Sequence, residues 1–192
     1  MKHLSISTLT ICGIAELPGQ SSRSVTHVLS ILDPNHPEID AFQAYGPHQR
    51  TTLRFDDIID PADGKIVPAP EHMTSVFEFG SGLISSAKSG GDGHLLVHCH
   101  AGVSRSTAAL LSLLAQANPR ENEDRLFERL RQIRPQAWPN SLMIKFADDL
   151  LGRAGRLEAA LRKHYGFQLK RDPVFIEWMN TLGRGRELEM AA

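Results

Sequence analysis

The chain of 192 residues has few of the features that mark several large protein classes. It contains two cysteines, Cys12 and Cys99, too few to indicate a disulfide framework in a chain of this length. No apolar run approaches the roughly 20 residues that a membrane-spanning helix requires, so we expect no membrane partner. The formal net charge is −1. Because nucleic-acid-binding proteins usually carry a basic excess, we expect no nucleic-acid partner either.

The N-terminus and the composition point to an ordinary globular protein. Lys2 precedes a partly apolar segment that resembles a signal peptide, but serines and threonines interrupt it between positions 5 and 10. We therefore expect a cytoplasmic protein. The chain has 41% hydrophobic and 22% charged residues, with no internal repeat or low-complexity segment. These proportions are typical of a chain that can bury a core.

The most informative segment surrounds Cys99. The apolar run Leu95–Val97 is typical of a short buried strand. Five residues that include Gly102 separate Cys99 from Arg105, and an apolar stretch at 108–117 is long enough for a helix. A strand, a tight loop and a helix N-terminus in this order favour anion binding. The loop N–H groups point inward, and the helix dipole adds positive charge at the same place.

The residue types in this loop fit phosphoryl chemistry. A helix N-terminus and a nearby cation lower the pKa of a cysteine from about 8.5, so we expect Cys99 to be a thiolate nucleophile. Arg105 offers a planar guanidinium that matches two phosphate oxygens. The hydroxyl of Ser106 can stabilise the sulfur when it departs as a leaving group.

The string His98-Cys99-x5-Arg105-Ser106 resembles the signature of the cysteine-based protein tyrosine phosphatases, and its interior is most similar to the dual-specificity branch and its bacterial relatives. The resemblance implies that Cys99 is the nucleophile, that Ser106 assists it, and that His98 orients the loop and tunes the thiolate. The phosphate-binding residues that it implies are His100, Ala101, Gly102, Val103, Ser104 and Arg105.

Cleavage of a phosphate ester also needs a proton donor for the leaving oxygen. The family places an aspartate for this role on a loop that lies one strand and one helix before the cysteine. That order implies Asp57, with Asp56 as the alternative because the family's Trp-Pro-Asp sequence is absent. A later segment, from Arg134 to Pro139-Asn140, also resembles the family and implies that Asn140 caps or braces the catalytic loop.

The hydrophobic pattern predicts an α/β fold: a short central, mostly parallel sheet flanked by helices on both faces, with Cys99 at the carboxyl edge of a strand. Strands are expected at 4–11, 26–32, 51–55 and 95–97, and helices at 70–88, 107–118, 121–134, 141–151, 156–165 and 173–182. We expect a loop with a fragment of strand at 34–47, a turn at 90–93 and a polar tail at 183–192. The resemblance implies a catalytic domain at 1–152, and residues 153–192 are expected to form a C-terminal helical extension packed on it.

The resemblance implies a phosphomonoester hydrolase that acts through a phosphocysteine intermediate. Many phosphoinositide-directed members of the family carry lysines in this loop, and the loop here has none. We therefore expect phosphorylated proteins as substrates, with phosphotyrosine as the first candidate. Inositol phosphates or other small phosphate esters are alternative substrates, and a non-catalytic phosphate-binding module is an alternative of another class. A rhodanese-type sulfurtransferase also carries a cysteine in a strand–loop–helix, but its usual loop is one residue shorter than the loop here. The loop length therefore argues against that class of enzyme. We expect no cofactor. We also expect no metal site, because neighbouring residues at 98–100 on an extended chain point to opposite faces.

Overall fold

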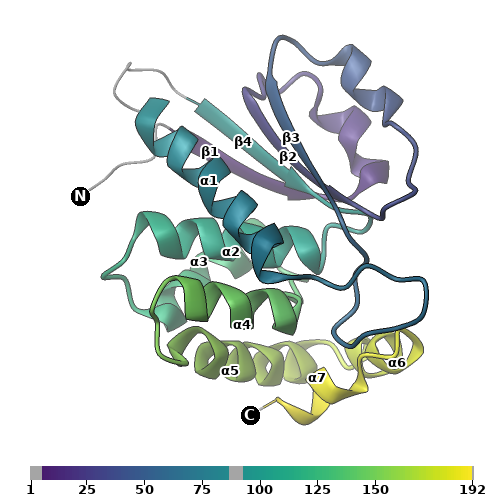
Figure 1. Ribbon diagram of the computed structural model, residues 1–192, viewed down its shortest axis with the longest axis vertical. Helices are drawn as coiled ribbons and strands as arrows, with labels where there is room; N and C mark the ends of the chain where they lie inside the picture. Colours follow the sequence, from purple (N-terminus) through teal and green to yellow (C-terminus); the bar gives the residue numbers. More distant parts are fainter. Residues whose placement is uncertain (1–5, 87–92, 192) are drawn as a thin grey trace.

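Four parallel strands form the central sheet of the molecule (Figure 1). The computed structural model describes residues 6–86 and 93–191. The strands are β1 (Ile6–Cys12), β2 (His27–Leu32), β3 (Gln49–Arg54) and β4 (Gly93–His98), in the spatial order β1-β4-β2-β3. β4 therefore lies between β1 and β2. Ligands of open parallel sheets bind beyond the carboxyl ends of such strands.

Both faces of the sheet are covered. Along β2, Val28 and Leu32 belong to the core on one face, whereas Leu29 and Ile31 belong to the core on the other. All four side chains are fully buried. Successive side chains of a strand point to opposite faces, so a strand buried on both sides has a nearly continuous apolar sequence.

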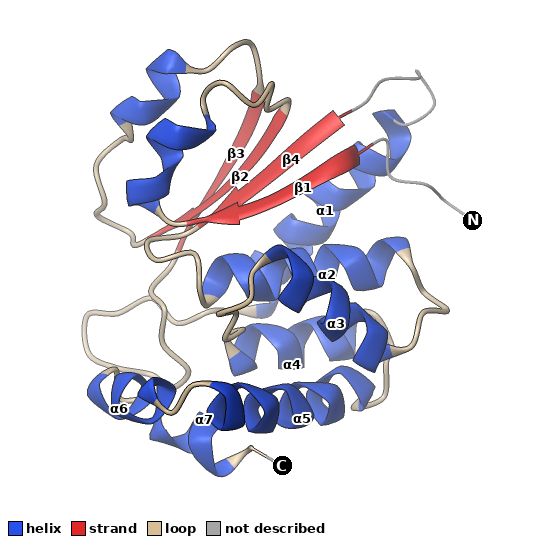
Figure 2. Cartoon of the chain, turned by 180° about the vertical axis from the view of Figure 1, so that it is seen from behind, coloured by secondary structure: helices blue, strands red, loops and turns tan. Residues whose placement is uncertain are grey.

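α-Helices cover one face of the sheet, and two short 3-10 helices, η1 (Ile14–Gln20) and η2 (Asp40–Ala44), cover the other (Figures 1 and 2). The expected α/β fold, with helices on both faces, is therefore confirmed. The fragment of strand expected within 34–47 is absent, and η2 stands in its place. The α-helices are α1 (Pro70–Ser86), α2 (Arg105–Ala117), α3 (Glu123–Ile133), α4 (Ser141–Leu150), α5 (Arg156–Arg171), α6 (Val174–Thr181) and α7 (Gly185–Glu189).

α2 is the central helix of this layer. It starts at the end of the Cys99 loop and packs against the sheet and against α1, α3 and α4. Its leucines, including Leu110, Leu111 and Leu114, are at most 2% exposed. The helix is apolar nearly all round because it is enclosed on every side.

The chain beyond α4 packs back onto the helical layer. α5 lies against α3 and α4, and α6 packs against α5 (Figure 2). The polar tail expected at 183–192 is wrong, because Arg184 and Glu187 are buried there and residues 185–189 form α7. Some residues of the expected elements lie outside the described ranges: 4–5 of the first strand, 87–88 of the first helix, 90–92 of the turn and 192 of the tail. Among the helices of the described ranges, none is both long and apolar enough to cross a membrane.

Candidate active site

The loop after β4 places Cys99 at the carboxyl edge of the sheet. Cys99 directly follows His98, the last residue of β4, and α2 begins at Arg105. Cys99 is 2% exposed, and its Sγ lies 3.2 Å from the Oγ of Ser106 in the first turn of α2. The Ser106 hydroxyl is thus positioned to donate a hydrogen bond to a negatively charged sulfur.

The carbonyl groups of this loop point away from its centre. Those of residues 100–103 accept hydrogen bonds of 2.8–3.1 Å from the backbone N–H groups of Ile14 and Trp138 and from the guanidinium of Arg134. In a planar trans peptide the C=O and N–H groups point in opposite directions. The N–H groups of residues 101–104 therefore point to the inner side of the loop, as in an anion-binding nest.

Two glycines allow the loop to lie directly against the end of β1. Gly102 has a φ of +68°, and a Cβ atom on it would lie 2.4 Å from the carbonyl carbon of Cys12. A Cβ atom on Gly13 would lie 2.8 Å from the carbonyl oxygen of His100. Both contacts are with backbone, which cannot move aside as a flexible side chain can. The loop conformation thus depends on glycine at both positions.

Arg105 is held by the ends of the neighbouring strands. It is 2% exposed, its Nη1 donates to the carbonyl oxygen of Phe55, and the same atom lies 2.8 Å from Asp33 Oδ1. Its buried Nε has no hydrogen-bond partner among the described residues and lies 3.9 Å from Asp57 Oδ2. A buried, fixed guanidinium with an unused donor is suited to hold an oxyanion.

The two candidate acids, Asp56 and Asp57, have different surroundings. Asp56 is buried and accepts hydrogen bonds from Lys65 Nζ at 2.9 Å and from the Ile66 N–H at 2.8 Å. Asp57 Oδ1 instead accepts from Ser104 Oγ at 2.7 Å and from Asn140 Nδ2 at 3.0 Å. Asp57 is the carboxylate that contacts the Cys99 loop, and its side chain is 29% exposed.

Opposing effects act on the pKa of Asp57. Burial alone would raise it, but the positive charges of Arg184 and Arg105, together with hydrogen bonds from Ser104 and Asn140, outweigh burial and hold the pKa below its usual value. The resting form is therefore the carboxylate. For Asp56, burial is likewise outweighed, here by the hydrogen bonds from Lys65 and Ile66, and its pKa is also lowered.

His98 is fixed through β2. Its Nε2 lies 2.7 Å from the Oγ of Ser30, which also accepts a hydrogen bond from Arg50. Burial lowers the pKa of His98 to about 4, so the ring is neutral at neutral pH. Any influence of His98 on Cys99 is therefore exerted by a neutral ring that anchors the loop to Ser30.

Asn140 caps α4 and braces the loop that carries Asp57. Its Oδ1 accepts from the backbone N–H groups of Leu142 and Met143, both at 3.1 Å. Its Nδ2 donates to Asp57 and, at 3.1 Å, to the carbonyl oxygen of Ile58. The resemblance implied that Asn140 braces the Cys99 loop, but its side chain binds the loop that carries Asp57.

Arg134 braces the Cys99 loop in its place. Its guanidinium donates to the loop carbonyls and to both carboxylate oxygens of Glu16, at 2.8 and 2.7 Å. Burial favours a higher pKa for Glu16, but the hydrogen bond from Arg134 is the larger effect and lowers it. The ion pair joins η1 to the loop, a contact that sequence analysis did not predict.

Asp33 and Arg184 also contact the site, although no sequence motif marked them. Asp33 follows the last residue of β2, and adjacent parallel strands end at the same edge, so the strand order would have placed it near Arg105. Arg184 lies in the segment read as a polar tail, where no hydrophobic pattern marks a contact. Its Nη1 is 2.7 Å from Ser104 Oγ and 3.3 Å from Asp57 Oδ1.

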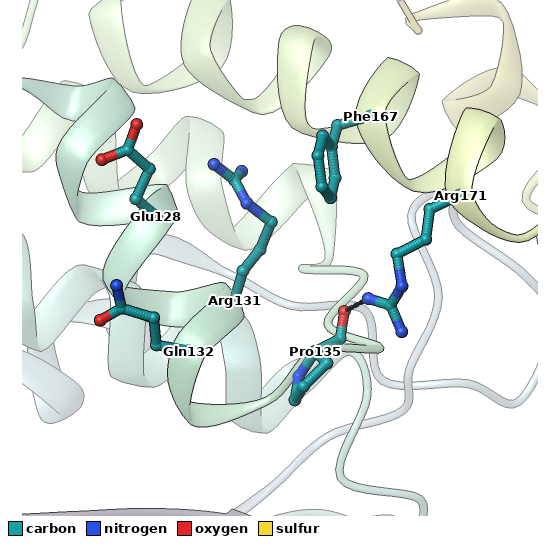
Figure 3. Close-up of a pocket in the computed structure, with 6 residues that line it drawn as sticks. All are labelled: Glu128, Arg131, Gln132, Pro135, Phe167 and Arg171. Carbon is teal, nitrogen blue, oxygen red and sulfur yellow. Dashed lines mark hydrogen bonds between the residues drawn. The ribbon is translucent and has the colours of Figure 1, made fainter.

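A pocket elsewhere on the surface lies between α3 and α5 (Figure 3). Arg171 donates a hydrogen bond to the carbonyl oxygen of Pro135 across it, and Arg131 stacks over the ring of Phe167. None of its lining residues is a predicted site residue. The candidate chemistry therefore belongs to the Cys99 loop and not to this pocket.

No protein-family model matches the chain, and no curated protein matches its sequence. Solved structures do match it. The phosphatase domain of Yvh1 from Chaetomium thermophilum is 21% identical, with a TM-score of 0.51 over 78% of this chain and 93% of that chain. The human tyrosine phosphatase-like serine/threonine/tyrosine-interacting protein is 18% identical, with a TM-score of 0.55 over 78% and 95%. Human DUSP28 is 17% identical, with a TM-score of 0.53 over 79% and 97%. The chain thus has the fold of the cysteine-based protein tyrosine phosphatases.

Proposed function

We propose that this protein is a cysteine-dependent phosphomonoester hydrolase of the protein-tyrosine or dual-specificity type. The observation that carries the proposal is the nest of inward N–H groups beside Cys99, together with the buried Arg105 at the end of the same loop, whose Nε has no hydrogen-bond partner among the described residues and lies 3.9 Å from Asp57 Oδ2. A nucleophile, an oxyanion site and a carboxyl group thus lie around one loop, as phosphoryl transfer requires.

In the first step the Cys99 thiolate attacks phosphorus. An Sγ–P bond forms while the ester P–O bond breaks, and Arg105 and the loop N–H groups stabilise the phosphoryl oxygens. Asp57, in its protonated form, gives its proton to the departing oxygen, which leaves as a neutral alcohol or phenol. The guanidinium and the N–H groups supply the positive charge, so the step requires no metal ion.

In the second step water attacks the phosphocysteine. The Asp57 carboxylate takes a proton from the water, an O–P bond forms, and the Sγ–P bond breaks to release inorganic phosphate and the Cys99 thiolate. Ser106 stabilises that thiolate by its hydrogen bond. Because a thiolate nucleophile keeps its activity in a reducing compartment, we place the reaction in the cytoplasm.

The charges around the site favour phosphotyrosine over polyphosphorylated inositol. Residues 100–104 include no lysine. The hollow lined by Asp33, Asp56 and Lys65 holds charges that are already paired, Asp33 with Arg105 at 2.8 Å and Asp56 with Lys65 at 2.9 Å. Neither residues 100–104 nor this hollow therefore offers an unpaired lysine to a second phosphate group, so we propose a singly phosphorylated side chain as the substrate.

Hydrolysis of p-nitrophenyl phosphate in the presence of EDTA tests the proposal. We expect turnover by the wild type, loss of turnover in Cys99→Ser, and turnover in Cys12→Ala. Cys12 is the matched control because burial raises the pKa of its thiol to about 12, so it remains protonated. No turnover by a folded wild type between roughly pH 5 and 8 would contradict the enzyme and favour a phosphate-binding module. Faster hydrolysis of inositol phosphates than of phosphotyrosine peptides would overturn the substrate proposal.

A further inference from the structure

The C-terminal segment reaches the candidate general acid. Arg184 lies between α6 and α7, and its side chain is 1% exposed. Its Nη1 donates to Ser104 Oγ at 2.7 Å and to Asp57 Oδ1 at 3.3 Å. The loop that leaves β3 runs down to α6 in both views of the ribbon (Figures 1 and 2). One guanidinium thus joins the Cys99 loop, the Asp57 loop and the C-terminal segment.

A second buried charge fixes the direction of this guanidinium. The Glu187 side chain is 0% exposed, and its Oε2 lies 2.7 Å from Arg184 Nη2. Glu187 also accepts hydrogen bonds from Trp138 Nε1 at 2.7 Å and from the backbone N–H of Ser141 at 2.8 Å. Glu187 is therefore anchored at the start of α4, and it holds Arg184 against Asp57.

Stability alone does not account for this arrangement. Removing two charges from water costs free energy, and apolar side chains of similar volume often give equal stability. The Nε of Arg184 is buried without a hydrogen-bond partner among the described residues, which adds to that cost. The geometry therefore favours a role in which the contact with Asp57 itself matters.

We propose that Arg184 is a positioning residue of the phosphatase reaction, which holds Asp57 and Ser104 in place for proton transfer. The inference rests on the function proposed above, because it assigns Arg184 a part in the same site. It also makes the C-terminal segment a component of the active site. Arg184 touches neither substrate nor phosphate in this proposal and acts through Asp57.

The charge of Arg184 gives the proposal a signature in the pH dependence. The titratable and charged groups that face Asp57 or its partners are Arg184, Arg105, Asp33, His100, Glu187 and Tyr165, beside the hydrogen-bond donors Ser104 and Asn140. Among these, Arg184 is the cation that favours the Asp57 carboxylate most. Removing it raises the pKa of Asp57, so the protonated acid persists to higher pH and the alkaline limb of kcat moves upward.

The test compares Arg184→Met and Arg184→Lys with Arg186→Met. The control removes the same charge two residues further along the chain, within α7, but the Arg186 side chain is 57% exposed and pairs with Asp60. With phenyl phosphate we expect Arg184→Met to lower kcat by about 10–100-fold and to move the alkaline limb to higher pH. With p-nitrophenyl phosphate the loss is smaller, because p-nitrophenolate departs with little help from an acid.

Arg184→Lys keeps the charge but not the planar guanidinium, so the alkaline limb of its pH profile stays near that of the wild type.

Equal pH profiles and equal leaving-group dependence in Arg184→Met and Arg186→Met would overturn the inference. A carboxyl titration of Asp57 by NMR separates this failure from that of the proposed function, because it needs no turnover. We expect the pKa of Asp57 to rise in Arg184→Met and to stay unchanged in Arg186→Met. An unchanged titration in Arg184→Met contradicts the inference, whereas an inactive wild type contradicts the proposed function.

Discussion

Single residues determine whether the Cys99 loop can form at all. Gly102 combines a positive φ with direct contact with the backbone of β1, and no residue with a Cβ atom satisfies both conditions. The sequence marked Gly102 only as part of a tight loop. Cys12 and Gly13 approach Gly102 because β1 lies beside the loop, and the sequence of the loop alone gives no information on where β1 lies.

Gly102→Ala should lower the free energy of unfolding by more than about 1 kcal/mol, because both the backbone conformation and the space oppose a Cβ atom. Urea unfolding of the variant measures this change. Gly46→Ala is the matched control, since a Cβ atom there meets nothing within 4 Å. A Gly102→Ala variant as stable as Gly46→Ala would contradict the account of the loop.

The sequence around Asp56 and Asp57 does not show which of the two is the general acid. Both carboxylates follow β3, and the sequence left both open as the general acid. Their partners separate them, since Lys65 and Ile66 bind Asp56 whereas Ser104 and Asn140 bind Asp57. Those partners lie up to 83 positions away in the chain. No local pattern around residue 56 contains this information.

Among the secondary-structure elements, α4 has a capping residue with two functions. Asn140 satisfies the free N–H groups at the start of the helix and also holds Asp57. Asn122 caps α3 in the same way, by accepting from Asp124 N at 2.9 Å, but it has no contact with Asp57. The two caps therefore form a matched pair.

Asn122→Ala should lower the free energy of unfolding by about 1 kcal/mol because it removes a helix cap, and Asn140→Ala should lower it by more because it also removes the hydrogen bonds to Asp57 and Ile58. Only Asn140→Ala should also lower kcat, since Asp57 then loses one of its hydrogen bonds. Thermal unfolding and steady-state hydrolysis of phenyl phosphate measure the two effects. Equal kcat values in the two variants would show that Asn140 is a cap alone.

Most elements could be predicted because their apolar residues follow the period of a strand or a helix. α2 is an example, since a helix that is apolar all round must be enclosed. α7 could not be predicted in this way. Its one fully buried side chain, Glu187, is charged, and it is buried because it and Arg184, which directly precedes the helix, neutralise each other and bind Asp57, Ser104 and Trp138. A sequence pattern shows the charges but not the partners.

At the scale of the whole molecule, two buried histidines make the fold sensitive to acid. Burial lowers the pKa of His98 and of His164 to about 4. His164 accepts a hydrogen bond from Arg131 and lies 2.9 Å from the carbonyl oxygen of Ala137, an arrangement that suits a neutral ring. One histidine ties the Cys99 loop to β2, and the other ties α5 to the segment before α4.

Stability should fall as the pH drops from about 6.5 towards about 4. The unfolded chain binds protons on these histidines near pH 6.5, whereas the folded chain does so only near pH 4, so the stabilisation is complete above 6.5 and is lost below it. We expect a loss of about 1–2 kcal/mol per histidine between roughly pH 7 and 5. Urea unfolding at both pH values measures it, and His164→Gln should show a smaller loss. A wild-type stability that does not change over this range would contradict the neutral state of both rings.

In the proposed mechanism, Cys99 carries the phosphoryl group during turnover. Mass spectrometry of the protein, quenched in acid while it hydrolyses p-nitrophenyl phosphate, detects such an intermediate. We predict one added phosphoryl group on the peptide that contains Cys99. It should accumulate further in Ser106→Ala, because the departing thiolate loses its hydrogen bond. Turnover without this adduct, or with the phosphoryl group on another residue, would contradict the account.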